Sequence, residues 1–181
     1  MSFVTVVNIQ EQVLRPHQLH SKLSSYEADM ILGQLVSILR NSYCYDEMTL
    51  KYVCRFLSPQ AYQYLVNERI LNQRCGYPLC DKSTAVHLHR DPFCMINVRA
   101  SYVTKYCSEM HMKASSFLYA QLSSTPLSER EGIHLIANFN REKYEQDSEK
   151  YDPIIFEEYL REKRTQNDVD ALIASIETLD F

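Results

Sequence analysis

Two residue pairs in the middle of the chain have the spacing and the chemistry of metal ligands. Cys75 and Cys80 are separated by four residues, and Cys107 and His111 by three. Tetrahedral zinc accepts both separations, and thiolate sulfur and imidazole nitrogen are its usual donors. A glycine and a proline inside the first pair favour a turn that brings both sulfurs to one point. The two pairs together predict one structural zinc ion held by three thiolates and one imidazole.

Other histidines could supply the fourth ligand, and the cysteines could be core residues that bind no metal. His87 and His89 lie between the two pairs and compete with His111 for the fourth position. A buried cysteine often serves only as a small apolar side chain. One pair alone could arise by chance, but two pairs joined by a segment of suitable length favour a metal site. Because that segment is longer than in a compact zinc finger, we expect the metal to staple elements of a larger domain.

The elements that must position these residues are predicted to be helices. The chain has only three glycines, and its apolar residues recur at helical spacing. The clearest helix begins after Ser24, which can form a capping box with Glu27, and it runs to about Arg40. Six apolar residues fall on one stripe of this helix: Ala28, Ile31, Leu32, Leu35, Ile38 and Leu39.

Two further helices lead to the first cysteine pair. Asp46 is the predicted cap of a helix that ends at Leu57. Ser58 is the predicted cap of the next helix, in which Pro59 takes the first position, where its missing N–H is no loss. This third helix extends over about residues 59–70. Its predicted buried residues are Tyr62, Leu65 and Val66.

The second ligand pair is expected on a helix of its own, from near Thr104 to Leu122. Cys107 and His111 would occupy its first two turns, because side chains four residues apart share one face of a helix. Zinc would then staple this helix to the end of the third one.

The remaining segments give weaker patterns. We expect a short helix over residues 3–14, an irregular loop over 81–103 with a short strand near Met95 to Val98, a helical turn from Thr125 to Gly132 and an extended segment from Ile133 to Ile136. Two C-terminal helices are predicted, the first with Asp152 as cap and Pro153 at its first position, the second capped by Asn167.

Length and composition predict one mainly α domain over residues 1–181, with little β structure. Within it we expect a zinc-stapled core over about residues 20–137, a polar linker over about 138–152 and a helical pair over about 153–180. Hydrophobic residues make up 45% and charged residues 23%, which is ordinary for a globular protein. The pattern indicates no oligomeric state.

Charge and cysteine usage narrow the classes of function. A formal net charge of −4 gives no general basic field for nucleic acid. No apolar run approaches the length of a membrane span, and residues 1–10 do not read as a signal peptide. Six cysteines in such a chain favour reduced thiols and metal over disulfides, so we expect the cytosol or the nucleus. Cys44, Cys54 and Cys94 are predicted to be free thiols without a catalytic role.

The words around the two pairs resemble those of a known family. Arg-Cys-Gly-Tyr-Pro-Leu-Cys at 74–80 and Tyr-Cys-Ser-x-x-His at 106–111 are similar to the zinc-binding signature of the RNA polymerase II C-terminal-domain phosphatases of the yeast regulator-of-transcription type and of the related polymerase II-associated proteins of animals. Flanking words at 49–52, 55–59, 121–123 and 132–135 agree with it. The resemblance covers roughly residues 20–140, and its core hexapeptide is specific.

The resemblance implies a function that the residues alone do not. It implies a protein serine phosphatase that acts on the phosphorylated heptad repeats of the largest polymerase subunit, chiefly at the fifth position, and that regulates transcription. RNA polymerase II would be the partner, and cytoplasm and nucleus the locations. In the family the two pairs are the zinc ligands, which assigns that role to Cys75, Cys80, Cys107 and His111. The competing interpretation is a factor without enzymatic activity that binds the polymerase for its assembly, nuclear import or tail docking.

No standard phosphatase motif accompanies the resemblance. Four residues separate Cys94 from Arg99, where a cysteine phosphatase needs five, and Asp168 does not begin an Asp-x-Asp-x-Thr word. A zinc ion with four protein ligands has no open position for water. The hypothesis left is an anion-binding patch beside the turn between Cys75 and Cys80, since guanidinium groups bind phosphate well. Its members would be Arg69, Arg74 and Lys82, with Glu68 as a base toward water.

The same residues have a plainer interpretation. Glu68 and Arg69 could simply form the solvated end of a helix, because charged side chains are mostly exposed. His134 follows a predicted glycine turn and is expected to be a hydrogen-bonded core histidine instead of a general base.

Overall fold

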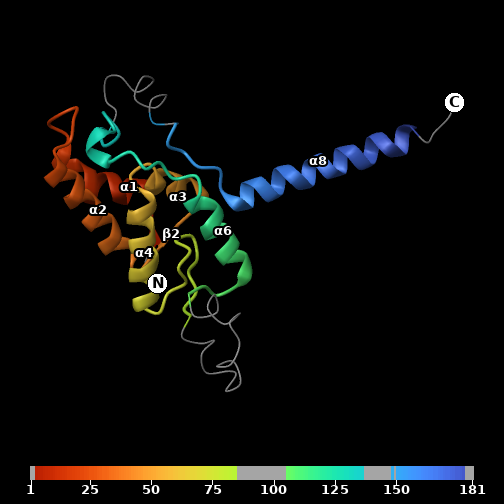
Figure 1. Ribbon diagram of the computed structural model, residues 1–181, viewed down its shortest axis with the longest axis horizontal. Coiled ribbons are helices and arrows are strands. Elements are labelled where there is room, and N and C mark those ends of the chain that lie inside the picture. The colour runs from red at the N-terminus through yellow and green to blue at the C-terminus, as the bar shows by residue number, and fades with distance from the viewer. Residues whose placement is uncertain (1–2, 85–104, 137–147, 149, 178–181) are drawn as a thin grey trace, which may run out of the picture.

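The computed structural model describes residues 3–84, 105–136, 148 and 150–177, and within them the chain is mainly helical (Figure 1). The predicted fold class is therefore confirmed. Side chains of the last part of the C-terminal helix, from residue 167 onward, are not described. The elements in order are β1 (Phe3–Val4), α1 (Val6–Ile9), the π-helix η1 (Gln10–Leu14), the 3-10 helix η2 (Arg15–His17), α2 (Ser25–Leu39), β2 (Tyr43–Cys44), α3 (Glu47–Cys54), α4 (Pro59–Leu71), α6 (Glu109–Tyr119), the 3-10 helix η5 (Leu127–Glu129) and α8 (Phe156–Glu177).

The helix starts that the sequence predicted are formed by the predicted caps. The Ser24 hydroxyl accepts from the Glu27 amide, and the Glu27 carboxylate accepts in return from the Ser24 backbone, which completes the capping box. An oxygen of Asp46 accepts from the Thr49 amide at 2.7 Å. Ser58 caps α4 through the Ala61 amide at 3.2 Å. Each cap satisfies one of the amides that a helix leaves without a partner.

The β structure is small, but it positions the first cysteine pair. β1 and β2 form a parallel pair of two residues each, with Val4 opposite Cys44. The Cys44 amide then donates to the Pro78 carbonyl at 2.9 Å. The N-terminal strand is thereby linked to the turn between Cys75 and Cys80, which we call the knuckle. β1 was not predicted, because residues 3–14 were expected to be one short helix; the segment is instead a strand followed by two short helical pieces, α1 and η1.

The core lies between α2, α3 and α4 and is continuous with the knuckle. Inward positions of these helices are fully buried, including Ile31, Leu35, Leu50 and Leu65. Cys75 belongs to the same buried cluster. The list of predicted core residues on α4 holds as well: Tyr62, Leu65 and Val66 are each at most 1% exposed.

Three predicted helix boundaries are wrong. α3 ends at Cys54 and not at Leu57, because the next two residues tighten into a turn in which the Phe56 amide bonds to the Val53 carbonyl. The helix predicted from Thr104 begins at Glu109, capped by Ser108, and ends at Tyr119. The segment from Ile133 to Ile136, predicted to be extended, begins in a turn in which the Leu135 amide donates to the Gly132 carbonyl at 3.0 Å.

The C-terminal prediction of two helices is also wrong. One helix of 22 residues, α8, covers Phe156–Glu177, so Asn167 lies inside a helix and not at the start of one. Pro153 does not begin a helix either. The Asp152 carboxylate accepts instead from Arg55, at 2.5 and 2.7 Å, and the helix begins three residues after Pro153, at Phe156.

The beginning of α8 packs against the body of the protein and its remainder extends away from it (Figure 1). Phe156 and Tyr159 pack on Phe117 of α6 at centroid separations of 5.5 and 5.4 Å. Arg161 forms a bidentate pair with Glu47 of α3. In the described part of the chain, no helix is both long and apolar enough to cross a bilayer.

Some predicted features lie outside the described residues. These are His87, His89, Cys94, the short strand from Met95 to Val98 and most of the polar linker at 138–152.

Candidate metal centre

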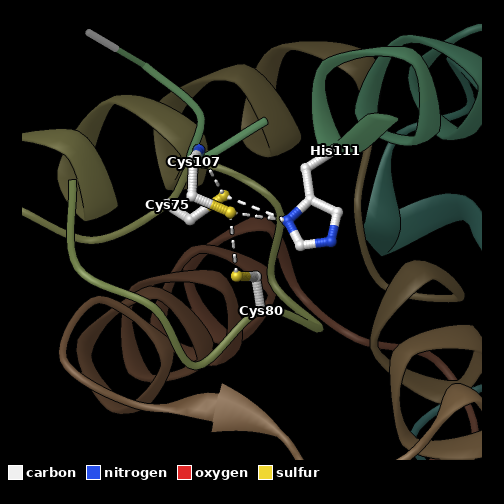
Figure 2. A group of neighbouring side chains, drawn as sticks. All are labelled: Cys75, Cys80, Cys107 and His111. Carbon is white, nitrogen blue, oxygen red and sulfur yellow. Dashed lines mark hydrogen bonds between the residues drawn. The ribbon is translucent and has the colours of Figure 1, made fainter. Parts of the chain in front are cut away.

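The four predicted ligands converge on one point although 36 residues separate the first from the last. Figure 2 shows the three sulfur atoms and the Nδ1 of His111 facing one another. The four donor atoms all lie within 4.8 Å of one another. The Cys107 sulfur is 3.0 Å from His111 Nδ1 and 3.5 Å from the Cys80 sulfur, and the Cys75 sulfur is 3.6 Å from the same imidazole nitrogen.

These separations fit a tetrahedral ion. Zinc–sulfur bonds of about 2.3 Å and zinc–nitrogen bonds of about 2.0 Å place the donors about 3.5–3.8 Å apart along the edges of a tetrahedron. Three of the six donor pairs lie 3.0 to 3.6 Å apart and none exceeds 4.8 Å, so small shifts of the side chains would bring the donors to the edges of such a tetrahedron. Four protein donors would complete its coordination and leave no open position, which makes a structural role the one that this donor set supports.

The knuckle holds its shape through backbone contacts on both sides. The Cys75 amide donates to the Lys82 carbonyl at 3.0 Å, and the Gly76 amide to the Lys105 carbonyl at 2.8 Å. The Lys82 amide in turn donates to the Cys80 sulfur at 3.4 Å. The backbone at Cys75 and Gly76 is thus fixed to the backbone at Lys82 and Lys105 by hydrogen bonds that involve no metal.

Only one of the two residues in the second pair lies on a helix. Cys107 precedes the Ser108 cap of α6, and its amide donates to the Cys75 sulfur at 3.4 Å. His111 stands in the first turn of α6, where its own amide bonds to the cap hydroxyl at 3.2 Å. Our expectation that both lie on one helical face is therefore wrong, yet the two donors still meet. The ring of Tyr77 packs against the His111 ring with centroids 5.4 Å apart.

Hydrogen bonds and burial shift the pKa values of the three clustered thiols in different directions. A hydrogen bond from the Cys80 thiol, together with one from His111, lowers the pKa of Cys75 to about 4 despite its burial. The same hydrogen bond raises the pKa of Cys80, and burial raises that of Cys107. Among the three thiols, Cys75 is therefore the one whose deprotonation these contacts favour. A divalent ion would draw off the remaining protons, since only thiolates ligate well.

Arg69 lies in the buried core and not at the surface. It was predicted to be part of an exposed anion patch, but its side chain is 0% exposed. Its guanidinium donates to carbonyl oxygens of the knuckle and of the segment after α2. With its donors so engaged, Arg69 cannot grip a phosphate group in this structure. A signal was present in the sequence: residue 69 continues the spacing of the buried residues 62, 65 and 66 on α4.

The other members of the predicted patch differ in their contacts and in their exposure. Arg74 donates to the carbonyls of Asp81 and Asn41 at 3.0 and 3.1 Å, so it fastens loops together. Lys82 is exposed, and Glu68 is half-buried on α4. A catalytic role for Glu68 stays a prediction.

Two predictions about single residues can be compared with the structure directly. His134 is fully buried, and its Nε2 lies 2.8 Å from the His20 carbonyl, as expected of a core histidine. Burial lowers its pKa. Cys44 and Cys54 are free and buried, and burial raises the pKa of the Cys44 thiol to about 12, so neither is suited to act as a nucleophile.

Fold and site together define a class: a mainly helical protein whose knuckle and following helix are stapled by a Cys3His metal cluster. Comparison with known proteins identifies the family. Residues 55–123 match the model of the Rtr1/RPAP2 family. The chain is 41% identical to the RNA polymerase II subunit B1 CTD phosphatase RTR1 of Saccharomyces cerevisiae over 97% of its own length and 79% of that protein. This chain belongs to the Rtr1/RPAP2 family, which confirms the resemblance seen in its sequence.

Solved structures and a more distant relative agree with this. A crystal structure of Saccharomyces cerevisiae Rtr1 superposes with a TM-score of 0.78 at 42% identity, covering 90% of this chain and 99% of that one. The crystal structure of the Kluyveromyces lactis Rtr1 NTD gives a TM-score of 0.66 at 38% identity, covering 75% and 90%. The CTD phosphatase Rpap2 of Rattus norvegicus is 35% identical over 47% of this chain but only 15% of its own length.

Proposed function

We propose that this protein is a serine phosphatase of the phosphorylated C-terminal domain of the largest RNA polymerase II subunit, and that it regulates transcription through this activity. One observation carries the proposal: 41% identity over 97% of the chain to a yeast protein that bears the name of such a phosphatase. The similarity covers nearly the whole chain and is therefore not limited to the metal-binding motifs. RNA polymerase II would be its partner.

We further propose that the metal is zinc and that it supports folding without taking part in the reaction. Three thiolates and one imidazole are a donor set typical of structural zinc, and they leave no position for a reacting water. Catalytic groups must then lie elsewhere in the chain. Glu68 remains the candidate for a base, because it is half-buried on α4 and directly precedes Arg69, which binds the knuckle.

The buried position of Arg69 and the loop contacts of Arg74 favour keeping a second candidate function. Neither guanidinium is offered to a phosphate in this structure, since Arg69 is fully buried and Arg74 bonds to two loop carbonyls. A polymerase-binding factor without enzymatic activity would need no such cation. It would act in assembly, nuclear import or docking of the tail.

The experiment that separates the two uses purified, zinc-loaded protein and tail peptides phosphorylated at a single serine of the heptad. Release of inorganic phosphate and peptide binding are measured side by side. A phosphatase releases phosphate with enzyme-dependent turnover, and Glu68→Gln reduces it at least about tenfold, or roughly 1.4 kcal/mol of barrier. Zinc content and thermal stability serve as controls and should not change. Peptide binding without any turnover would establish the binding factor instead.

A third part of the proposal concerns location. A protein that acts on the polymerase tail must reach the nucleus after its synthesis in the cytoplasm, so we propose that it is found in both. Imaging of a fluorescent fusion tests this, and a protein confined to either compartment would contradict it.

A further inference from the structure

Among the described residues, two arginines are buried, and their hydrogen bonds all go to backbone carbonyls. Arg69 is 0% exposed and Arg130 is 2% exposed. Burying a guanidinium is costly unless its donors are satisfied and its charge is compensated. Backbone carbonyls satisfy the donors of both arginines, but only the carbonyls around Arg69 include those of the knuckle.

Three of the carbonyls that Arg69 binds belong to the knuckle. Its Nε donates to the Cys75 carbonyl at 2.9 Å, and its Nη2 donates to the carbonyls of Cys80 and Tyr77 at 2.9 and 3.4 Å. Two of the three carbonyls are those of metal-ligand residues. A single rigid side chain thus fixes both ends of the knuckle and its middle.

The remaining donor of Arg69 anchors the knuckle to the rest of the fold. Nη1 donates to the Leu39 carbonyl at 2.5 Å and also to the carbonyl of Ser42. Leu39 is the last residue of α2, and helix ends leave carbonyls without partners within the helix. Arg69 therefore ties the first two thiol ligands to the end of the longest core helix.

Charge supplies the compensation that the carbonyls do not. Three thiolates carry one more negative charge than a divalent ion supplies, so a loaded Cys3His site is a buried anion. Arg69 carries one positive charge, and an arginine keeps it in proteins. As thiolates, Cys75 and Cys80 favour the charged guanidinium against its burial. Arginine and loaded site together are neutral.

We propose that Arg69 is the positioning residue and counter-ion of the metal centre: it holds the knuckle carbonyls in place and neutralises the loaded site. Groups that orient metal ligands from outside the coordination sphere typically contribute about 10–100-fold to metal affinity. Arg69 would contribute by keeping Cys75 and Cys80 close together before the ion arrives, and by cancelling the excess negative charge afterwards.

Arg130 provides the matched control. It is buried to the same degree, and its guanidinium donates to the carbonyls of Arg55, Leu57, Ser123 and Thr125. None of these residues is a metal ligand, and the described contacts of Arg130 do not include the knuckle. Replacing either arginine removes a buried clamp of similar size, but only Arg69 faces the metal site.

The test compares zinc retention by the purified, zinc-loaded full chain in Arg69→Met, Arg69→Lys and Arg130→Met, using a chromogenic chelator as competitor. We expect Arg69→Met to bind zinc about 10–100-fold more weakly, and Arg130→Met to retain it like the wild type although both variants melt earlier. Arg69→Lys keeps the charge but loses the planar fork, so its affinity should be intermediate.

Three outcomes would overturn the proposal. Wild-type zinc affinity in Arg69→Met would show that the arginine does not serve the metal. An equal loss in Arg130→Met would show that zinc is lost with any general destabilisation. If Arg69→Met does not fold, Arg69→Lys decides, and a wild-type affinity in that variant would refute the positioning role. The inference needs the metal centre but not the phosphatase activity, so it can fail while that proposal stands.

Discussion

Replacing Gly76 by alanine should destabilise the knuckle for a steric reason that can be worked out from its surroundings. A Cβ at this position would lie 2.9 Å from Tyr106 Cε1, 3.0 Å from Val66 Cγ1 and 3.1 Å from the Lys105 carbonyl oxygen. The carbonyl cannot retreat freely, because it accepts the Gly76 amide at 2.8 Å. Tyr106 is held in turn by a hydrogen bond of 3.0 Å to Ser115.

Overpacking of this kind costs about 1–3 kcal/mol. For a chain of this length each kcal/mol lowers the melting temperature by about 2–4 °C. We therefore expect Gly76→Ala, in excess zinc, to melt about 2–12 °C below the wild type when unfolding is followed by circular dichroism. Gly76 is not among the residues with positive φ, so the loss would come from crowding and not from backbone strain.

Gly33→Ala is the matched control. Gly33 is exposed inside α2, and an added Cβ would meet nothing within 4 Å. Because glycine lowers the stability of a helix interior by roughly 0.5–1 kcal/mol relative to alanine, this variant should melt slightly above the wild type. If Gly76→Ala behaves like Gly33→Ala, the close packing around the knuckle is not what we describe.

Two further predictions concern the metal and a buried thiol. His111→Ala should lose zinc by elemental analysis and unfold at a lower temperature, whereas His89→Ala should keep one zinc per chain; the reverse pattern would reassign the fourth ligand. Burial raises the pKa of Cys44 to about 12, so between about pH 9 and 12 the unfolded chain releases this proton while the folded chain keeps it, and stability falls by up to about 1.4 kcal/mol per pH unit. Urea unfolding should show a shallower alkaline loss in Cys44→Ala, and an unchanged slope would contradict the assigned cause.

Signals that act over three or four residues were sufficient to predict much of the fold. Ser24 with Glu27, Asp46 with Thr49, and Ser58 before Pro59 each satisfy a helix start locally, and each prediction holds. The spacing within each ligand pair is equally local. The four ligands could therefore be predicted from the sequence, and the structure brings the two pairs together.

Predictions failed where a residue is used by a distant segment. Asp152 precedes a proline and has the local form of a cap, but Arg55, 97 residues earlier in the chain, takes its carboxylate. The start of α6 is a different case, because Ser108 followed by Glu109 is a local signal that favours a helix start four residues after Thr104. Arg69 was assigned to the surface because charged residues usually lie there. Its carbonyl partners come from segments whose proximity no local pattern reveals.

The contacts around Tyr77 suggest how far the influence of the metal extends. Its ring packs on that of His111, and its hydroxyl donates to the Glu157 carboxylate at 2.9 Å. Glu157 lies in the first turn of α8, so one side chain joins the knuckle, the imidazole ligand and the C-terminal helix. Loss of the ion would release His111, and with it one wall of the Tyr77 site. We therefore expect removal of the metal to weaken the attachment of α8 to the core, although no residue of α8 belongs to the described ligand cluster.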